Sequence, residues 1–126
     1  MKITQAFLIV NDQDKAKAFY TDVLGLEVET DYSGEGFRWL SLRAPGQEGG
    51  ASLVLSAPSD GCTAFQREMR EKGMPIFSFD IANDAEFEAI RDRGATVLME
   101  PTQQQYGGTD ALIDDTVGNI ICLHQN

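Results

Sequence analysis

The alternation of apolar and polar residues predicts that the chain begins with a strand, a helix and a second strand. Residues Ile3–Val10 follow the two-residue period that is typical of a half-buried strand. Asn11 or Asp12 is then expected to cap a helix, and Gly25, which tolerates a left-handed backbone, to end it. The apolar residues between these points share one helical face, and they are Ala16, Phe19, Tyr20, Val23 and Leu24.

Three further strands and a helix are predicted in the rest of the first half. The strands are expected at Leu26–Thr30, Phe37–Leu42 and Ala51–Ser56, with a turn over 32–36 and a loop over 45–50. A linker over 57–61 leads into a helix at Thr63–Lys72, where apolar residues lie four apart and Gly73 marks the end.

The second half repeats the same order of elements. The expected segments are the strand Pro75–Ile81, the helix Asp84–Arg93, and the strands Ala95–Met99, Gly108–Ile113 and Asn119–His124. Gly94 stands where Gly25 stands in the first half, and Pro101 is expected to end the strand before it. The pattern predicts an α+β protein of one domain, residues 1–126, built from two βαβββ modules. The N-terminal module spans about 1–57, a linker helix about 58–73 and the C-terminal module about 74–126.

Composition narrows the classes of partner. The net charge is −10, which argues against binding to nucleic acids or anionic membranes, because both need Lys and Arg to neutralise phosphate. No segment has the pattern of a signal peptide or a transmembrane helix, so a cytoplasmic protein is expected. Cys62 and Cys122 are far apart and unpatterned, and are interpreted as free thiols.

Four segments in order resemble the glyoxalase/bleomycin resistance/dioxygenase family, also called the vicinal oxygen chelate superfamily. They are VNDQDKAKAFYTDVLGLEV from Val10, GFRWLSLRAPG from Gly36, EPTQQQYGG from Glu100, and DDTVGNIICL from Asp114. The resemblance implies that the sheets of the two modules curl around a cleft, with helices outside. It also implies a homodimer, because the family commonly covers its exposed sheet edges by pairing chains.

Most enzymes of this family hold a divalent metal with His, Gln or Glu from four strands. The resemblance places these positions at Gln5, Val54, Ile76 (or Phe77 with a different gap) and Cys122. Only an amide and a thiol are donors there, and the single histidine, His124, is near the chain end. The expectation is therefore no metal and no other cofactor.

Without a metal, the cleft would be an apolar cavity with a few polar groups, which is the usual form of a small-molecule site. The candidate ligand-binding residues are Gln5, Phe7, Trp39, Tyr106 and Cys122, and no catalytic residue is identified. Each has a plainer interpretation, since the aromatic residues can be core and Cys122 an inert buried thiol. Arg38 is expected in a surface or interface ion pair, and the acidic residues Asp12, Asp114 and Asp115 in turns.

The favoured function is binding of a small organic molecule without metal, as in resistance by sequestration. The alternative is a metal-dependent lyase, isomerase or dioxygenase with atypical ligands, so whether the protein is an enzyme stays open. A third possibility is a scaffold whose cleft is filled by its own side chains. The identity of the ligand does not follow from the sequence.

Overall fold

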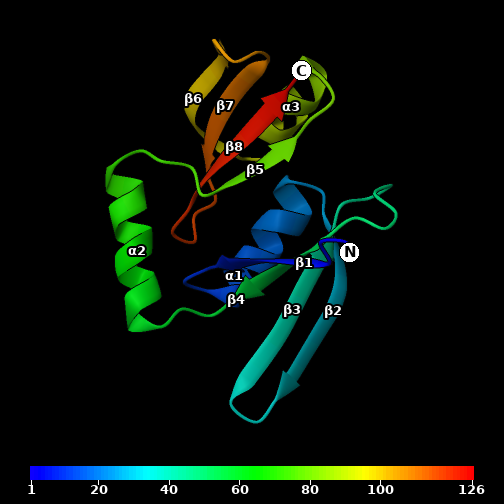
Figure 1. The fold of residues 1–126 in the computed structure, drawn as a ribbon, viewed down its shortest axis with the longest axis vertical. Coiled ribbons are helices and arrows are strands. Elements are labelled where there is room, and N and C mark those ends of the chain that lie inside the picture. Colours follow the sequence, from blue (N-terminus) through cyan, green and yellow to red (C-terminus); the bar gives the residue numbers. More distant parts are fainter.

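Two four-stranded sheets form the framework of the computed structural model, which describes residues 1–126 (Figure 1). The first sheet has the order β1-β4-β3-β2, with strands β1 (Gln5–Ile9), β2 (Glu27–Gly34), β3 (Phe37–Arg43) and β4 (Ser52–Ser56). The second has the order β5-β8-β7-β6, with strands β5 (Phe77–Asp80), β6 (Thr96–Gln103), β7 (Thr109–Asp114) and β8 (Ile120–Gln125). In each sheet the first strand pairs in parallel with the last, and the other pairs are antiparallel. The predicted α+β fold of two βαβββ modules is confirmed.

The helices begin and end largely where the local sequence predicts. They are α1 (Gln13–Ala18), which continues into the π-helical turn η1 (Phe19–Val23), α2 (Asp60–Glu71) and α3 (Asp84–Asp92). Asp12 caps α1 by accepting a hydrogen bond from the backbone N–H of Lys15 at 3.0 Å. Gly25 has a φ of 80°, so its left-handed role is also confirmed. None of the helices is both long and apolar enough to cross a lipid bilayer.

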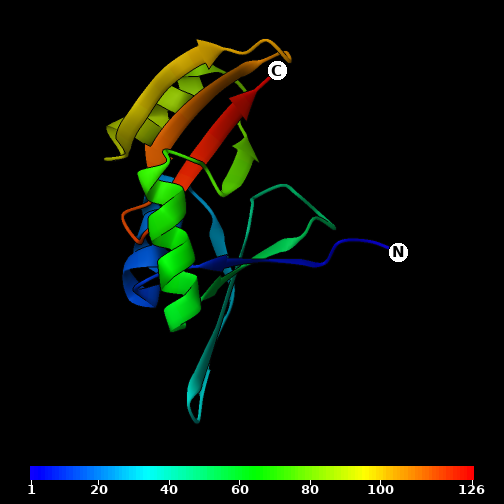
Figure 2. The same cartoon turned by 60° about the vertical axis from the view of Figure 1, so that its left-hand side comes forward.

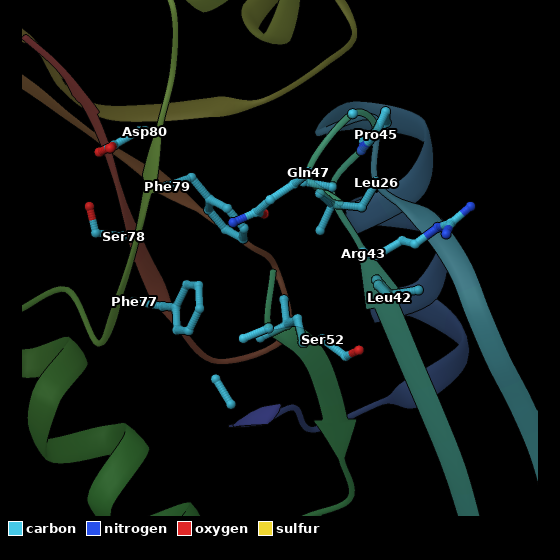
Figure 3. Close-up of a pocket in the computed structure, with 15 residues that line it drawn as sticks. Leu26, Leu42, Arg43, Pro45, Gln47, Ser52, Phe77, Ser78, Phe79 and Asp80 are labelled. Atoms are coloured by element: carbon cyan, nitrogen blue, oxygen red, sulfur yellow. The ribbon is translucent and has the colours of Figure 1, made fainter. Parts of the chain in front are cut away.

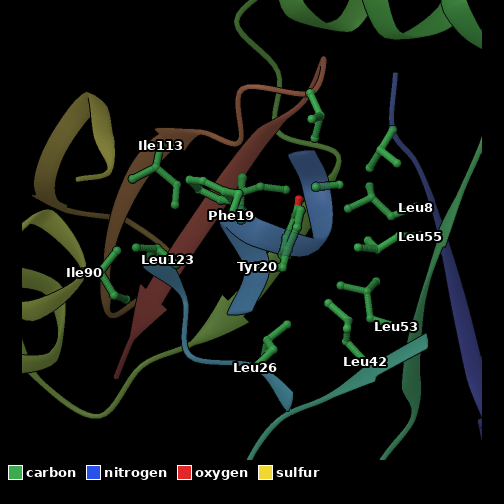
Figure 4. Close-up of a cluster of buried hydrophobic side chains, with 14 of the residues drawn as sticks. Leu8, Phe19, Tyr20, Leu26, Leu42, Leu53, Leu55, Ile90, Ile113 and Leu123 are labelled. Carbon is green, nitrogen blue, oxygen red and sulfur yellow. The ribbon is translucent and has the colours of Figure 1, made fainter. Parts of the chain in front are cut away.

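The two modules share one core, and α1 with η1 lies in its middle (Figure 4). Phe19 and Tyr20 lie between the side chains of the two sheets, with Leu8 and Leu55 toward the first sheet and Leu123 toward the second. This buried cluster has 17 residues drawn from both modules. Each sheet packs one face on the helices, and through these two faces the modules contact each other.

A buried polar network crosses the same junction. Asp115, in the loop between β7 and β8, accepts a hydrogen bond from the Tyr20 hydroxyl at 2.7 Å and from the Asn119 amide at 2.7 Å. The amides of Asn119 and of Gln66, on α2, donate to the carbonyl of Ile9 at 2.9 and 2.7 Å. Figure 2 shows α2 running along the side of the molecule, from the first sheet toward the second. The network thus connects η1, α2, the end of β1 and the β7–β8 loop.

Three predicted boundaries were wrong. Strand β2 extends through the expected turn to Gly34, and only two residues separate it from Phe37, its partner in β3. Strand β6 continues past Pro101, because β6 is an edge strand and a missing N–H on the open edge breaks no ladder hydrogen bond. Helix α2 begins at Asp60, inside the expected linker.

We expect Tyr20→Phe to lower the free energy of unfolding by about 1–3 kcal/mol, because it removes one donor from a carboxylate that has no access to water. Urea denaturation of wild type and variant measures the difference. Tyr32→Phe is the matched control, since Tyr32 is exposed and a similar change there should cost less than about 0.5 kcal/mol. Equal stability of Tyr20→Phe and wild type would show that the hydrogen bond to Asp115 contributes nothing net.

Candidate functional site

The face of the first sheet that points away from the helices carries three of the predicted site residues. Phe7 pairs in register with Val54, and side chains two apart along a strand share a face, so Gln5 and Phe7 lie on the same side of β1. The ring of Phe7 stands edge-on to that of Trp39 on β3, with centroids 6.0 Å apart. Gln5, Phe7 and Trp39 are thus brought together.

This face leaves large aromatic side chains in contact with solvent. Phe7 is 60% exposed, Tyr32 59% and Phe37 57%, and the rings of Tyr32 and Phe37 lie 5.9 Å apart. Contiguous apolar surface of this kind is typical of a ligand-binding or interaction face. Arg38 points to the opposite side of β3, where it forms ion pairs with Asp31 and Asp14, so its interpretation as an ion-pair residue is confirmed.

The corresponding face of the second sheet contains a hollow of about 610 Å³. Strands β5, β7 and β8, the β6–β7 loop, and the residues Pro75 and Asn126 form its wall. The lining residues are Pro75, Ser78, Asp80, Tyr106, Gly107, Gly108, Asp110, Cys122, His124 and Asn126. The other two predicted site residues, Tyr106 and Cys122, are therefore brought together here.

A hydrogen-bonded group of side chains occupies the centre of this hollow. Asp110 is only 7% exposed, and its Oδ1 lies 2.6 Å from Nδ1 of His124 on the neighbouring strand β8. Its Oδ2 accepts a hydrogen bond from the Tyr106 hydroxyl. The other ring nitrogen of His124, Nε2, lies 3.2 Å from Oδ1 of Asn126, an exposed residue at the chain end. Both oxygens of Asp110 are thus engaged, and Nε2 is the outward-facing group.

These contacts shift the pKa values of the three groups. The hydrogen bond with Asp110 raises the pKa of His124 above its ordinary value, and it raises the pKa of Tyr106 to about 12. Burial acts to raise the pKa of Asp110, but the hydrogen bonds from Tyr106 and His124 together outweigh burial and lower it. Asp110 is therefore the anionic member of the group, and Tyr106 stays neutral at physiological pH.

Gly108 fixes the position of the imidazole ring. It has a φ of 77°, and a Cβ atom built on it would lie 2.6 Å from Cε1 of His124 and 2.7 Å from the carbonyl oxygen of Gln125. Only glycine provides both this conformation and this close approach. The turn before β7 therefore packs against the Cε1–Nε2 part of the ring, and Asp110 bonds its Nδ1.

The four positions at which the family's enzymes hold a metal do not present a fitting donor set here. Gln5 and Val54 share one face of the first sheet, and Cys122 lies opposite Ser78 in the second. Ile76 and Phe77, the expected third position, instead pack against the core. No group of three or more His, Cys, Asp or Glu side chains is arranged to hold a metal ion. An amide, two hydrocarbon side chains and a thiol are weak or absent ligands for a divalent ion.

Cys122 has the character of an inert thiol rather than a nucleophile. It is buried, and burial is the main reason that its pKa is raised above the ordinary value. A reactive or metal-binding cysteine needs the thiolate form, which a raised pKa makes scarcer. Cys62 is also a free thiol.

A second hollow, of about 660 Å³, lies between the modules (Figure 3). Phe77 and Phe79 point into it from β5, and Gln47 and Leu42 face them from the first module, whereas Ser78 and Asp80 point to the other side of β5. Ser78 and Asp80 line both hollows, which therefore adjoin at this edge strand. None of the five predicted site residues lines the hollow between the modules.

Comparison with known proteins identifies relatives of the whole chain. The family model of the Glyoxalase/Bleomycin resistance protein/Dioxygenase superfamily matches residues 2–123. The chain is 34% identical over 128 residues to the uncharacterized protein YurT of Bacillus subtilis (strain 168), with 99% of each chain covered.

Two solved structures are similar over nearly their full length. The crystal structure of UcmS2 has a TM-score of 0.83 at 28% identity and covers 98% of this chain and 97% of its own. The crystal structure of TnmS3, an antibiotic binding protein from Streptomyces sp. CB03234, has a TM-score of 0.78 at 26% identity and covers 99% of this chain and 95% of its own.

Proposed function

This chain belongs to the Glyoxalase/Bleomycin resistance protein/Dioxygenase superfamily, and we propose that it binds a small organic molecule without the help of a metal ion. The observation that carries the proposal is which side chains lie together at the positions where the family's enzymes bind metal. Gln5 shares its face with Val54, and Cys122 lies opposite Ser78. The faces that hold a metal in the enzymes are here lined by aromatic rings and by hydrogen-bonding groups that are already paired.

The similarity to an antibiotic binding protein supports the same class of function. TnmS3 resembles this chain over almost the whole length of both proteins. Sequestration of a flat, partly apolar compound needs the exposed aromatic surface that the first sheet provides, and the second sheet adds polar groups that orient a ligand. The alternative, a metal-dependent lyase, isomerase or dioxygenase, would require ligands other than those at the family positions.

A second copy of the chain completes the proposed site. The predicted binding residues are divided between two faces, with Phe7 and Trp39 on the first sheet and Tyr106 and Cys122 on the second. A symmetric dimer that places the first sheet of one protomer against the second sheet of its partner would join the two sets and cover the exposed aromatic rings. In this proposal the cleft belongs to the dimer.

Purified protein is expected to contain no stoichiometric zinc, nickel, manganese or iron, and a chelator should leave the melting temperature unchanged. A bound ion would stabilise the folded state by mass action, so its removal would lower that temperature. Elemental analysis and a thermal scan with and without EDTA provide the measurements. One equivalent of metal that is lost in Gln5→Ala would support the enzyme alternative instead.

Flat aromatic compounds are expected to change the fluorescence of Trp39, which is the only tryptophan and lies beside Phe7. Tyr106→Ala should weaken binding several-fold, because an aromatic contact contributes on the order of 1 kcal/mol beyond area burial. Trp39→Phe should also weaken binding, because the smaller ring buries less area against the ligand. Calorimetry measures the affinities of both variants. Phe65→Ala, on exposed α2 surface, is the control and should bind as wild type does.

The result that would contradict the ligand-binding proposal is also specific. If both aromatic variants keep full affinity but lose stability, these rings pack the fold and the site lies elsewhere. If a broad compound panel yields no binder, the scaffold interpretation replaces the binding one.

The dimer predicts a mass of twice 13.8 kDa in sedimentation equilibrium at micromolar concentration. Phe7→Glu should shift the protein toward the monomer, because it places a charge in the centre of the aromatic face that the partner would cover. Phe65→Glu makes the same change on an exposed residue of α2 and should leave the mass unchanged. A monomeric wild-type protein at high micromolar concentration would refute the shared cleft.

A further inference from the structure

We propose that His124, held by Asp110, anchors the ligand and that it selects neutral molecules carrying an acidic hydroxyl group, of which phenols are the simplest class. This inference rests on the proposed function and names the chemistry of its ligand. It draws on the hollow of the second sheet, where the histidine presents Nε2 outward.

The imidazole is fixed before any ligand arrives. Asp110 bonds Nδ1 at 2.6 Å, and Gly108 lies so close to the ring that a side chain there would collide with Cε1 and Nε2. Asp110 is itself held by the Tyr106 hydroxyl. Because the carboxylate accepts the Nδ1–H, the tautomer is set and Nε2 is left for an outside partner. Asn126, which contacts Nε2 at 3.2 Å, is exposed, so a ligand oxygen can take its place.

An acidic hydroxyl suits Nε2 in either protonation state of the ring. A neutral imidazole accepts a hydrogen bond from the hydroxyl, and an imidazolium donates one to the corresponding oxyanion. The same single proton lies between the ligand oxygen and Nε2 in both cases, so no proton has to be taken from or released to water. An ether oxygen lacks that proton and cannot satisfy a neutral imidazole.

The charges around Nε2 disfavour ligands that are always anionic. Asp110 on β7 and Asp80 on β5 face the hollow, and no Lys or Arg lines it. Tyr106 and Cys122, the other titratable groups there, have raised pKa values and stay neutral. A carboxylate ligand would therefore meet the negative charge of Asp110 and Asp80 with no Lys or Arg to compensate it.

Three probes of one shape test this selection, namely 4-nitrophenol, 4-nitroanisole and 4-nitrobenzoate, each measured by equilibrium dialysis against the full-length protein near pH 7. We expect 4-nitrophenol to bind about tenfold more tightly than 4-nitroanisole, which is the effect of one charge-assisted hydrogen bond. The benzoate should bind more weakly than the phenol.

Two substitutions connect this preference to the named residues. His124→Asn and Asp110→Asn should each reduce the ratio between phenol and ether to near one, the first by removing Nε2 and the second by removing the anionic partner of the ring. Asp92→Asn makes the same chemical change as Asp110→Asn on the exposed surface of α3 and should keep the full ratio. Melting temperatures confirm that the variants are folded, and the ratio is compared only among folded variants.

The outcomes separate this inference from the function on which it rests. Equal binding of phenol and ether supports a small-molecule site but overturns the role of His124. A preference for the phenol that survives His124→Asn also overturns it. Failure of 4-nitrophenol to bind overturns this inference by itself, whereas the proposed function fails only when the broader compound panel finds no ligand.

Discussion

The arrangement of this protein depends on one buried carboxylate, that of Asp115. The side chain has no exposed surface, so its charge must be compensated by hydrogen bonds within the protein. Tyr20 and Asn119 donate from their side chains, and the backbone N–H groups of Val117 and Asn119 donate to the other oxygen. Removing any of these donors would leave a charge partly unpaired inside the core, which is far more costly than losing a surface contact. The N-terminal helix and the last loop are therefore held in one relative position.

The position of this helix between the modules determines which faces of the sheets stay exposed. With α1 between the modules, most of the helix-packed face of each sheet is buried in the shared core, and the remainder lines the hollow between the modules. The opposite faces stay uncovered, one bearing the edge-to-face pair of Phe7 and Trp39 and the other the hollow around Asp110. The same burial that stabilises a chain of this size thus leaves one face of each sheet open to solvent.

Local rules explain why much of the fold could be predicted from the sequence. The cap at Asp12 and the left-handed Gly25 each depend on residues within a few positions, and both appear as expected. The continuation of β6 through Pro101 could not be predicted, because it depends on β6 being an edge strand, which is a property of the sheet. The length of the β2–β3 hairpin likewise depends on pairing with a partner strand rather than on turn residues such as Gly34.

In the candidate site, too, some features follow from local sequence and others depend on strand pairing. Phe7 and Trp39 could be selected as aromatic residues on particular strands, and Tyr106 as one beside a glycine turn. The pairing of Asp110 with His124, in contrast, joins residues 14 apart through the register of β7 and β8. Sequence alone made His124 a residue at a fraying chain end. The register instead places it beside a nearly buried carboxylate, and Gly108 holds the ring from the other side. The one available signal was the glycine pair before β7, since glycine is needed where backbone approaches a ring closely.

The chemistry of the second sheet also argues against simply restoring a metal to the family positions. A thiol binds a metal as the thiolate, and the raised pKa of Cys122 means that a proton must first be removed at a cost in free energy. His124 offers a metal one nitrogen, Nε2, because Nδ1 is bonded to Asp110, and a single nitrogen does not make a metal site. Asp110 in turn has both oxygens engaged, so the strongest donors of this face are bonded to one another rather than directed at a common point. Such a set of groups is organised to present a single hydrogen-bonding atom, which is what the orientation of a neutral organic ligand requires.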